Sequence, residues 1–433
     1  MSPASVEKIK ASDLVLWIAL AVFLRMACVF AAVHGDIIYI NYYASKLAYE
    51  KVFDIYRYIS MHPCEGSWTY YPPLTYFVMG AFQYVFKFVN HGFYQWIQQV
   101  YTGGVKQWLL AAGPSLGFFK YLFLMKLPYA VFDCLSIFAI FRFLADSRSR
   151  LRGLKLWAFS PVILYGTYMF GGIDIIPASL AVLSVLLIKR RQRWWGLLCL
   201  SIAALFKTFT IFLMLPFLIV LTCSGKDLFK NVVPLALPVV IVLTPFFISS
   251  GGLVIGSIFP PYTPEGAGAS AAVYLLAKRA IFLGLYSLLI LSCFKLKKVL
   301  GNVSVLNISV SALMLVYIML FVPVSYFIWV TPFLIIAASL GMIPLWLYWF
   351  QIICLFMYNL NSPNTTTALL APLNAQFFLD LPGLPDLMHG FSIRWGAVML
   401  AARLVFTAIC VLMAMGLVGQ ISFFKQLKVT GDR

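Results

Sequence analysis

Residues 14–36, LVLWIALAVFLRMACVFAAVHGD, indicate the fold class of the whole chain. An α-helix needs about 20 consecutive apolar residues to cross the roughly 30 Å hydrocarbon core of a bilayer, and the run from Leu14 to Val33 meets that requirement. Lys8 and Lys10 precede it, so the positive-inside rule places its start in the cytoplasm. The run is too long for a signal peptide. We therefore expect an uncleaved first helix, with His34 and Asp36 emerging on the extracytoplasmic side.

The composition extends this expectation to the rest of the chain. Of 433 residues, 62% are hydrophobic and only 11% are charged, and the mean hydropathy is +0.93. These values are typical of a polytopic membrane protein. Long apolar runs recur from end to end without the alternation of strands, and helices satisfy their own backbone hydrogen bonds in lipid. The sequence predicts an all-α fold with a single transmembrane domain over residues 1–433.

The distribution of charge predicts the topology. The net charge of +18 comes from short basic clusters between apolar runs, which indicates membrane orientation and no nucleic-acid partner. A full crossing at Leu74–Phe88 would leave the most basic loop, residues 148–155, outside, so we interpret Leu74–Phe88 as interfacial or re-entrant. About twelve crossings (11–13) follow, with both termini inside. They are expected near 14–33, 118–143, 156–170, 175–188, 196–207, 208–222, 232–250, 280–294, 303–322, 325–340, 342–357 and 395–416.

This topology concentrates titratable side chains on the extracytoplasmic face. The loops on that face are a large first loop, 34–117, and two further loops, 251–272 and 358–394. All four histidines fall there, together with Asp36, Glu50, Asp54, Glu65, Asp174, Glu265, Asp380 and Asp386. The eight cysteines are scattered without a CxxC pair, so we expect neither a disulfide framework nor a zinc site.

Two acidic motifs are candidates for chemistry. In His34-Gly35-Asp36 a carboxylate just past a helix end lies near low dielectric, which predicts a raised pKa suited to a general base. The alternative is a solvated acid at a helix terminus. In Gly171-Gly172-Ile173-Asp174 the acid could be functional or could be the N-cap of the following helix. The residues alone leave both alternatives open.

Six stretches, in order, carry a resemblance to a known family. They are HGDIIYINY, SWTYYPPLTYFVMG, KLPYAVFDCLSIFAIFRF, SPVILYGTYMFGGIDIIPASLAVLSVLLIKRR, GLLCLSIAALFKTFTIFLMLPFL and PVSYFIWVTPFLI. The chain resembles the GT-C superfamily of membrane glycosyltransferases, and within it is similar to the mannosyltransferase of GPI-anchor assembly and its bacterial relatives. The resemblance covers roughly residues 14–222 and the motif near Tyr326.

The resemblance implies a polyprenyl-phosphate sugar donor and an acidic motif in the first extracytoplasmic loop that supplies the base. Asp36 matches one acid of that motif, while His34 and Ile38 stand where a second acid would be. Asp36 is then the sole base, helped by His34, or the second carboxylate is Asp174 or Glu50. Loss of the paired acid weakens the case for a hard cation, which favours an oxygen-rich site. We expect no cofactor; a divalent metal is allowed but not obligatory.

The implied activity is that of a hexosyltransferase that moves a mannose-like sugar, with inversion, to a lipid-linked or surface glycan acceptor of the cell envelope. The other expected partners are membrane lipids, in a bacterial inner (plasma) membrane with the site facing outward. Basic residues at extracytoplasmic helix ends would assist the departing phosphate. Lys207 is preferred, because the family often has a lysine in its Ala-Leu-x-Lys stretch. The other candidates are Lys278, Arg279, Arg394 and, less clearly, Lys126, and the alternative for each is snorkelling to the interface.

The remaining candidate residues are aromatic side chains and a charged side chain within the first helix. Tyr71 and Tyr326 are candidate substrate-binding residues, with an interfacial aromatic belt as the alternative. Arg25 within the first helix is expected to pair with Asp133 as a structural bridge. Two other functional classes stay open. A transporter or flippase would show paired halves and midplane charges, and a non-catalytic subunit of a transferase complex would fit the reduced acidic motif.

Overall fold

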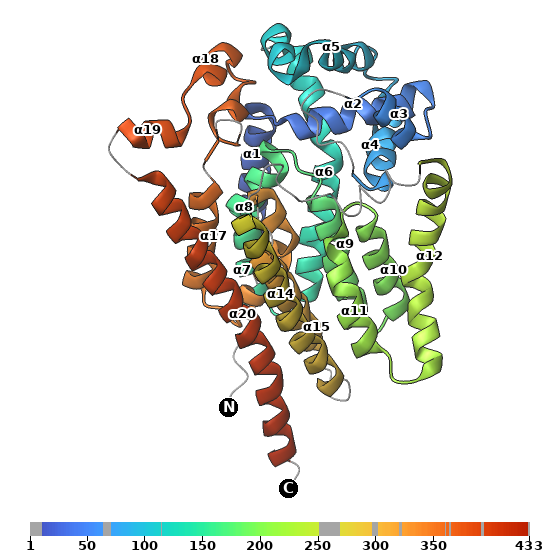
Figure 1. Ribbon diagram of the computed structural model, residues 1–433, viewed down its shortest axis with the longest axis vertical. Helices are drawn as coiled ribbons and strands as arrows, with labels where there is room; N and C mark the ends of the chain where they lie inside the picture. The colour runs from blue at the N-terminus through green and yellow to red at the C-terminus, as the bar shows by residue number, and fades with distance from the viewer. Residues whose placement is uncertain are drawn as a thin grey trace.

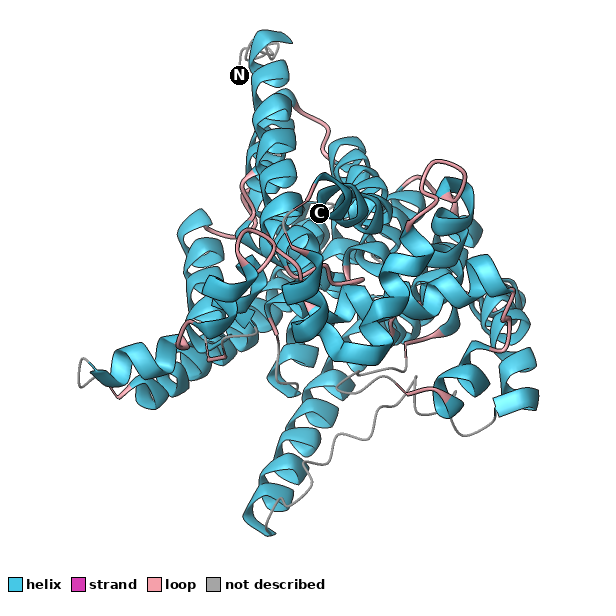
Figure 2. Ribbon diagram, turned by 90° about the horizontal axis from the view of Figure 1, so that it is seen from above, coloured by secondary structure: helices cyan, strands magenta, loops and turns pink. Residues whose placement is uncertain are grey.

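A computed structural model describes residues 11–63, 71–113, 115–250, 269–296, 302–319, 323–359, 361–362, 365–390 and 394–431. Throughout these ranges the regular secondary structure is helical and contains no strand, which confirms the all-α prediction (Figure 2). Lys8, Lys10, Glu65, Glu265 and residues 251–268 of the expected second loop lie outside the described residues.

Helices follow one another along the chain with short connections between most of them. In chain order they are α1 Ala11–Ala31, α2 Gly35–Glu50, α3 Ile55–Met61, α4 Pro73–Phe86, α5 Phe93–Ala112, α6 Leu116–Phe143, α7 Ser147–Ala158, α8 Pro161–Ile163, the π-helix η1 Leu164–Met169, α9 Ile175–Lys189, α10 Arg193–Ala204, η2 Thr208–Thr210, α11 Ile211–Leu221, α12 Gly225–Ser250, α14 Ala269–Leu296, α15 Asn302–Met319, η3 Val324–Trp329, α16 Thr331–Ser339, α17 Leu345–Asn359, η5 Thr367–Leu370, α18 Ala375–Asp380, α19 Leu384–Gly390 and α20 Trp395–Gly431.

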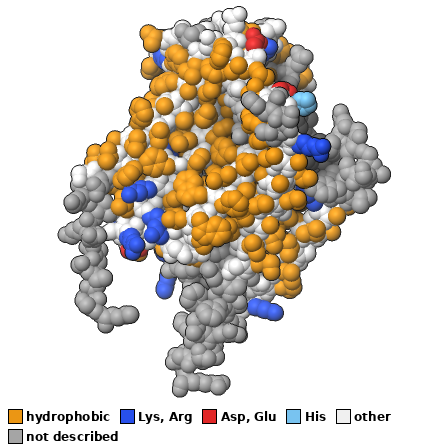
Figure 3. Space-filling view, turned by 90° about the vertical axis from the view of Figure 1, so that its left-hand side faces the viewer, with side chains coloured by type: hydrophobic (Ala, Val, Ile, Leu, Met, Phe, Trp, Pro, Cys, Tyr) orange, Lys and Arg blue, Asp and Glu red, His pale blue; other side chains and the backbone are white. Residues whose placement is uncertain are grey.

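Five helices of the described chain are long and apolar enough to cross a membrane, as expected of a membrane protein. The stretches concerned are Leu14–Ala31, Leu116–Phe143, Gly225–Ser250, Leu276–Lys295 and Trp395–Gly416. Large apolar side chains are exposed along these helices, and Figure 3 shows an apolar surface over most of one face. Other expected crossings fall on the shorter apolar helices α9, α10, α11, α15 and α17, so the count of twelve stays a prediction.

The expected first loop, 34–117, folds into the four helices α2 to α5. α2 and α5 lie across the upper end of the molecule, while α1 and α6 run down from it (Figure 1). α4 has 14 residues and is therefore about 21 Å long at 1.5 Å per residue, too short to cross roughly 30 Å of hydrocarbon alone. Its length is compatible with the interfacial or re-entrant run expected at Leu74–Phe88.

Three prolines, at positions 161, 216 and 332, fall within apolar runs, and two of them coincide with the beginning of a helix. Pro161 and Pro332 each stand at the beginning of a helix, where the missing N–H is harmless. Pro216, by contrast, lies inside a continuous α11. The chain instead breaks a few residues earlier, between α10 and η2, where Lys207 has the extended backbone angles φ −159° and ψ 136°.

A buried ion pair ties four of these elements together. Arg25 Nε of α1 lies 2.8 Å from Asp133 Oδ2 of α6, which confirms the expected bridge. The same carboxylate accepts hydrogen bonds from Trp157 Nε1 and from the hydroxyl of Tyr168, both at 2.8 Å. The guanidinium also donates to the carbonyls of Ala158 and Trp157. Both charges make several further hydrogen bonds, as buried charges require, and the bridge is therefore structural.

Candidate functional site

Asp36 lies in the first turn of α2, directly after the end of α1. His34 is the N-cap of α2, and its Nδ1 lies 3.2 Å from the backbone N of Asp36 and 3.4 Å from Asp36 Oδ1. The imidazole stacks on Phe170 at a centroid distance of 3.8 Å, which fixes the plane of the ring. The hydroxyl of Tyr71 donates a long hydrogen bond of 3.4 Å to Asp36 Oδ2. The carboxylate keeps 27% of its side-chain surface exposed, so a ligand can reach it.

The electrostatics of Asp36 differ from the expectation. Partial burial disfavours the carboxylate, but the hydrogen bond and charge of His34, the charge of Lys207 and the hydrogen bond from Tyr71 outweigh burial, so the pKa of Asp36 is lowered. The raised pKa expected from the sequence is therefore wrong. Burial and the negative charge of Asp36 raise the pKa of Tyr71, so its phenol stays protonated and acts as a donor. Asp36 is ionised at neutral pH.

Asp174 precedes α9 but does not cap it. It occupies the N-cap position without a capping hydrogen bond from its side chain. Its Oδ1 instead lies 2.7 Å from Lys207 Nζ and 2.5 Å from Trp329 Nε1. The residue is only 2% exposed, and burial of an ionised carboxylate requires such partners. The capping role considered from the sequence is excluded, and Asp174 belongs to a buried polar cluster.

Lys207 occupies the centre of that cluster, at the break between α10 and η2. Its ammonium lies 3.9 Å from the ring centroid of Tyr326 and 5.7 Å from that of Tyr71. Trp329 stacks between Tyr326 and Phe209, at centroid distances of 4.7 Å and 4.4 Å. The aromatic rings surround the ammonium, and cation–π attraction holds it in place. The Lys207 side chain is 13% exposed.

Two glycines allow close packing at the site, and one of them brings the two acidic segments into contact. Gly171 has a positive φ of 74°, and a Cβ there would lie 3.0 Å from Ile37, the neighbour of Asp36. Gly166 of η1 packs against η3, since a Cβ there would lie 2.6 Å from the side chain of Ile328. Only glycine suits both the left-handed backbone and the close approach at position 171. The glycine motif thus joins the first turn of α2 to the turn that carries Asp174.

The position of Glu50 excludes it as the partner of Asp36. It lies 14 residues further along the same helix, which is about 21 Å at 1.5 Å per residue. There it accepts hydrogen bonds from Lys46, at 2.7 Å, and from the hydroxyl of Tyr94. The charges of Asp36 and Asp174, by contrast, both act on Tyr71. Of the two alternatives for a second carboxylate, only Asp174 shares the site.

The other basic candidates are not partners of these carboxylates. Arg279 is exposed on α14, beside the half-buried Lys278, and Arg394 is exposed just before α20. Lys126 is 1% exposed, and its Nζ donates to the carbonyls of Val29, Ala32 and Tyr168. Lys126 therefore ties the end of α1 to η1, and its expected alternative roles at the interface or on a phosphate do not fit this position.

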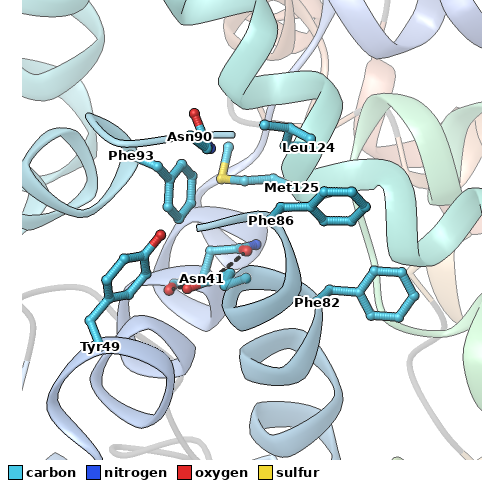
Figure 4. A pocket seen from close by; sticks show the side chains of 9 residues that line it. Asn41, Tyr49, Phe82, Phe86, Asn90, Phe93, Leu124 and Met125 are labelled. Atoms are coloured by element: carbon cyan, nitrogen blue, oxygen red, sulfur yellow. Dashed lines mark hydrogen bonds between the residues drawn. The ribbon is translucent and has the colours of Figure 1, made fainter. Parts of the chain in front are cut away.

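Two hollows lie near the site without containing it. A cavity of about 10 Å³ is lined by Asn41, Gln83, Asn90 and neighbouring aromatic rings (Figure 4), and it has room for about one water molecule. A larger, mainly apolar groove of about 460 Å³ lies between α3, α4 and the end of α12. Leu74 lines the groove and stands three residues after Tyr71, whose hydroxyl bonds to Asp36.

Sequence reasoning did not assign two residues of the site and missed the main contact of a third. Trp329 was part of a recognised aromatic motif, but its bond to Asp174 had no sequence signal. Phe209 and Tyr129 read as ordinary apolar residues of long runs. Tyr129 is fully buried on α6, and the charges of Asp174 and Asp36 both act on its hydroxyl.

Within the described residues, no group of three or more His, Cys, Asp and Glu side chains has the arrangement of a metal site. The loop 358–394 contacts the site: the carbonyl of Leu369 in η5 accepts a 2.8 Å hydrogen bond from the N–H of Val33, directly before His34.

Comparison with protein-family models found no match, and no curated protein is significantly similar to the chain.

Proposed function

We propose that the chain is a membrane glycosyltransferase that transfers a hexose from a polyprenyl-phosphate donor to a lipid-linked or surface glycan acceptor, with Asp36 as the general base. The observation that carries this proposal is the junction of Asp36, Asp174 and Lys207 at one end of the helical frame. An ionised carboxylate, a buried ammonium and aromatic walls meet the needs of sugar transfer from a phosphate.

The reaction is a single displacement with inversion at the anomeric carbon. Asp36 accepts the proton of the acceptor hydroxyl, whose oxygen forms a bond to the anomeric carbon while the bond to the phosphate oxygen breaks. Lys207 has three N–H donors, and Asp174 takes one. The other two suit the oxygens of the departing phosphate. Asp174 and Trp329 act as positioning residues, because they hold the ammonium and each other in place.

Two further features support the class of substrate. The rings of Tyr71 and Tyr326 lie beside the ammonium, and aromatic faces suit the CH groups of a sugar. The apolar groove that begins at Leu74 suits an isoprenoid chain in a membrane. The lowered pKa of Asp36 makes it a weak base in the free protein but keeps it ionised. Its basicity would rise when substrate excludes water from the site.

The test is a transfer assay with the purified full chain in lipid and radiolabelled polyprenyl-phosphate sugars. Asp36→Asn keeps the size of the side chain and removes the base, so we expect transfer to fall about 10²- to 10⁴-fold. Asp380→Asn is the matched control, because Asp380 of α18 is 70% exposed and pairs loosely with Lys106 at 3.9 Å. Unchanged transfer by Asp36→Asn would exclude Asp36 as the base. Absence of wild-type transfer with every donor would favour a transporter, a flippase or a non-catalytic subunit.

A further inference from the structure

The hydroxyl of Tyr129 is a buried polar group without a hydrogen-bond partner among the residues that the structure describes. Its side chain is 0% exposed, and among the described residues no hydrogen-bond partner reaches the oxygen. Burial of a hydroxyl without a hydrogen bond costs stability in proteins. Phenylalanine would fill the same space without that cost, so the oxygen calls for an explanation.

The position of Tyr129 on α6 directs it toward the site. Three residues before it, Lys126 bonds to the carbonyl of Ala32, two residues before His34. Three residues after it, the ring of Phe132 packs on Phe206, the neighbour of Lys207, at 6.5 Å. Residues three apart lie on the same face of a helix. Tyr129 therefore stands between the contact of α6 with the Asp36 segment and its contact with the Lys207 segment.

The charges around the hydroxyl agree with this placement. Asp174 and Asp36 are the two charged groups that act on it, yet neither carboxylate accepts its proton. A neutral donor beside two carboxylates is a poor site for a phosphate, which they would repel. It suits a ligand hydroxyl, which can donate to a carboxylate and accept from the phenol at the same time.

We infer that the Tyr129 hydroxyl binds a hydroxyl group of the sugar that is transferred or of the sugar that accepts it. This inference rests on the proposed function and adds a sugar-binding residue to it. The phenol completes its hydrogen bond only in the bound complex, so the cost of its burial is relieved by the correct ligand. A ligand that lacks the hydroxyl would leave the cost in place, which makes Tyr129 a specificity-determining residue.

Tyr129→Phe tests the inference, since it removes one oxygen and no hydrogen bond to any residue that the structure describes. The thermal midpoint of the purified, lipid-reconstituted variant should equal or exceed that of the wild type. Its KM for the polyprenyl-phosphate sugar or for the glycan acceptor should rise about tenfold, and the substrate whose KM rises identifies the sugar that is bound. Affinity for polyprenyl phosphate without a sugar should be unchanged.

Two control variants show how the loss of a buried tyrosine hydroxyl acts elsewhere in the protein. Tyr348→Phe removes another fully buried tyrosine hydroxyl, on α17 near Ser160, and should change neither KM. Tyr168→Phe removes a hydroxyl that donates to Asp133 and should lower the thermal midpoint. A midpoint for Tyr129→Phe as low as that of Tyr168→Phe would show a protein partner and overturn the inference. So would unchanged values of both KM.

Binding of free methyl hexosides, measured as stabilisation of the protein, gives a test that does not depend on transfer. Stabilisation of the wild type by a methyl hexoside, lost in Tyr129→Phe, supports the sugar contact even where no polyprenyl-phosphate donor reacts, and then only the proposed donor fails. Equal stabilisation of both proteins overturns the Tyr129 contact alone. A wild type that neither transfers nor is stabilised by any sugar overturns both.

Discussion

Lys207 Nζ lies 2.7 Å from Asp174 Oδ1, although the two residues are 33 positions apart. The ammonium comes from a break between two helices, and the carboxylate comes from the glycine turn before α9. Their side chains are 13% and 2% exposed, so water screens the pair only weakly. The pair fixes the electrostatic centre of the site, because the charge of Lys207 also acts on Asp36.

The pair predicts strong coupling between its two residues. Asp174→Asn leaves the ammonium without its counter-charge, and Lys207→Met leaves a buried carboxylate. Each should lower the free energy of unfolding by about 3–5 kcal/mol. The double variant should lose clearly less than the sum of the two, because neither charge is then buried alone. Chemical or thermal unfolding of the four proteins measures the coupling, and additive losses would contradict a direct interaction.

The sequence predicts much of this arrangement because charge in an apolar chain is rare. Polar residues at the ends of long apolar runs identified His34, Asp36, Asp174 and Lys207, and the structure brings all four together. The same rule for intramembrane charges predicted the bond between Arg25 and Asp133. In each case the cost of burying an unpaired charge leaves few alternatives.

Other features of the site depend on tertiary contacts that no local pattern encodes. Lys126 stands in a run that reads as a helix near the interface, but three carbonyls from two separate segments surround its ammonium. The π-helix η1 has no signature in LYGTYM, and the break at Lys207 is not at a proline. The sign of the Asp36 pKa shift depends on partners that the chain brings from positions 71 and 207.

The lowered pKa of Asp36 predicts how stability depends on pH. A carboxyl whose pKa is lower in the folded state stabilises the fold fully above its unfolded pKa, about 3.9, and loses that contribution as the pH falls through the folded value. We expect the difference in thermal midpoint between wild type and Asp36→Asn to be constant from about pH 5 to pH 8 and to shrink only below about pH 4. A stability of the wild type, relative to Asp36→Asn, that falls as the pH rises from about pH 5 to pH 7 would show a raised pKa instead.

The same shift predicts an infrared result. The band of a protonated carboxyl that is present in wild type and missing in Asp36→Asn should appear only below about pH 4. Asp380→Asn corrects for an ordinary exposed carboxyl, because Asp380 is 70% exposed. Any acid limb of the transfer rate near neutral pH would then belong to a group other than Asp36.

The Arg25–Asp133 bridge predicts that its loss lowers the stability of the fold more than it lowers the rate of transfer. Asp133→Asn removes the charge that balances Arg25 and weakens the bonds from Trp157 and Tyr168. The free energy of unfolding should fall by about 3–5 kcal/mol. Arg25→Met with Asp133→Leu should recover part of the loss, since both charges then leave the interior. A double variant no more stable than Asp133→Asn would contradict an unbalanced charge as the cause.

Lys126 predicts a different pattern, because its partners are carbonyls and not a carboxylate. Lys126→Met keeps the length of the side chain but leaves the carbonyls of Val29, Ala32 and Tyr168 without this donor. We expect a loss of about 2–5 kcal/mol in the free energy of unfolding. Lys120→Met on the same helix is the control, since Lys120 makes one exposed hydrogen bond to Val89. Equal stability of the two variants would show that Lys126 does not hold α1 against η1.

The orientation of the chain in the membrane leads to the last prediction. Asp36 follows the end of α1, and the basic segment 148–155 follows α6, which returns from the α2 end of the molecule (Figure 1). The positive-inside rule then places Ser60 outside and Arg148 in the cytoplasm, and both residues are exposed. A chain with its native cysteines replaced, and with Ser60→Cys or Arg148→Cys, allows the two sides to be compared directly.

A membrane-impermeant maleimide should label Ser60→Cys in intact cells and should label Arg148→Cys only after the membrane is permeabilised. Both positions are exposed. A cysteine that fails to react there therefore lies on the inaccessible side of the membrane and is not simply buried in the protein. Labelling of Arg148→Cys in intact cells would require α4 to cross fully or α1 to run in the opposite direction. The first case would keep Asp36 outside, and the second would move it to the cytoplasmic face. Labelling of Ser60→Cys in the same cells distinguishes the second case, because only there would it be lost.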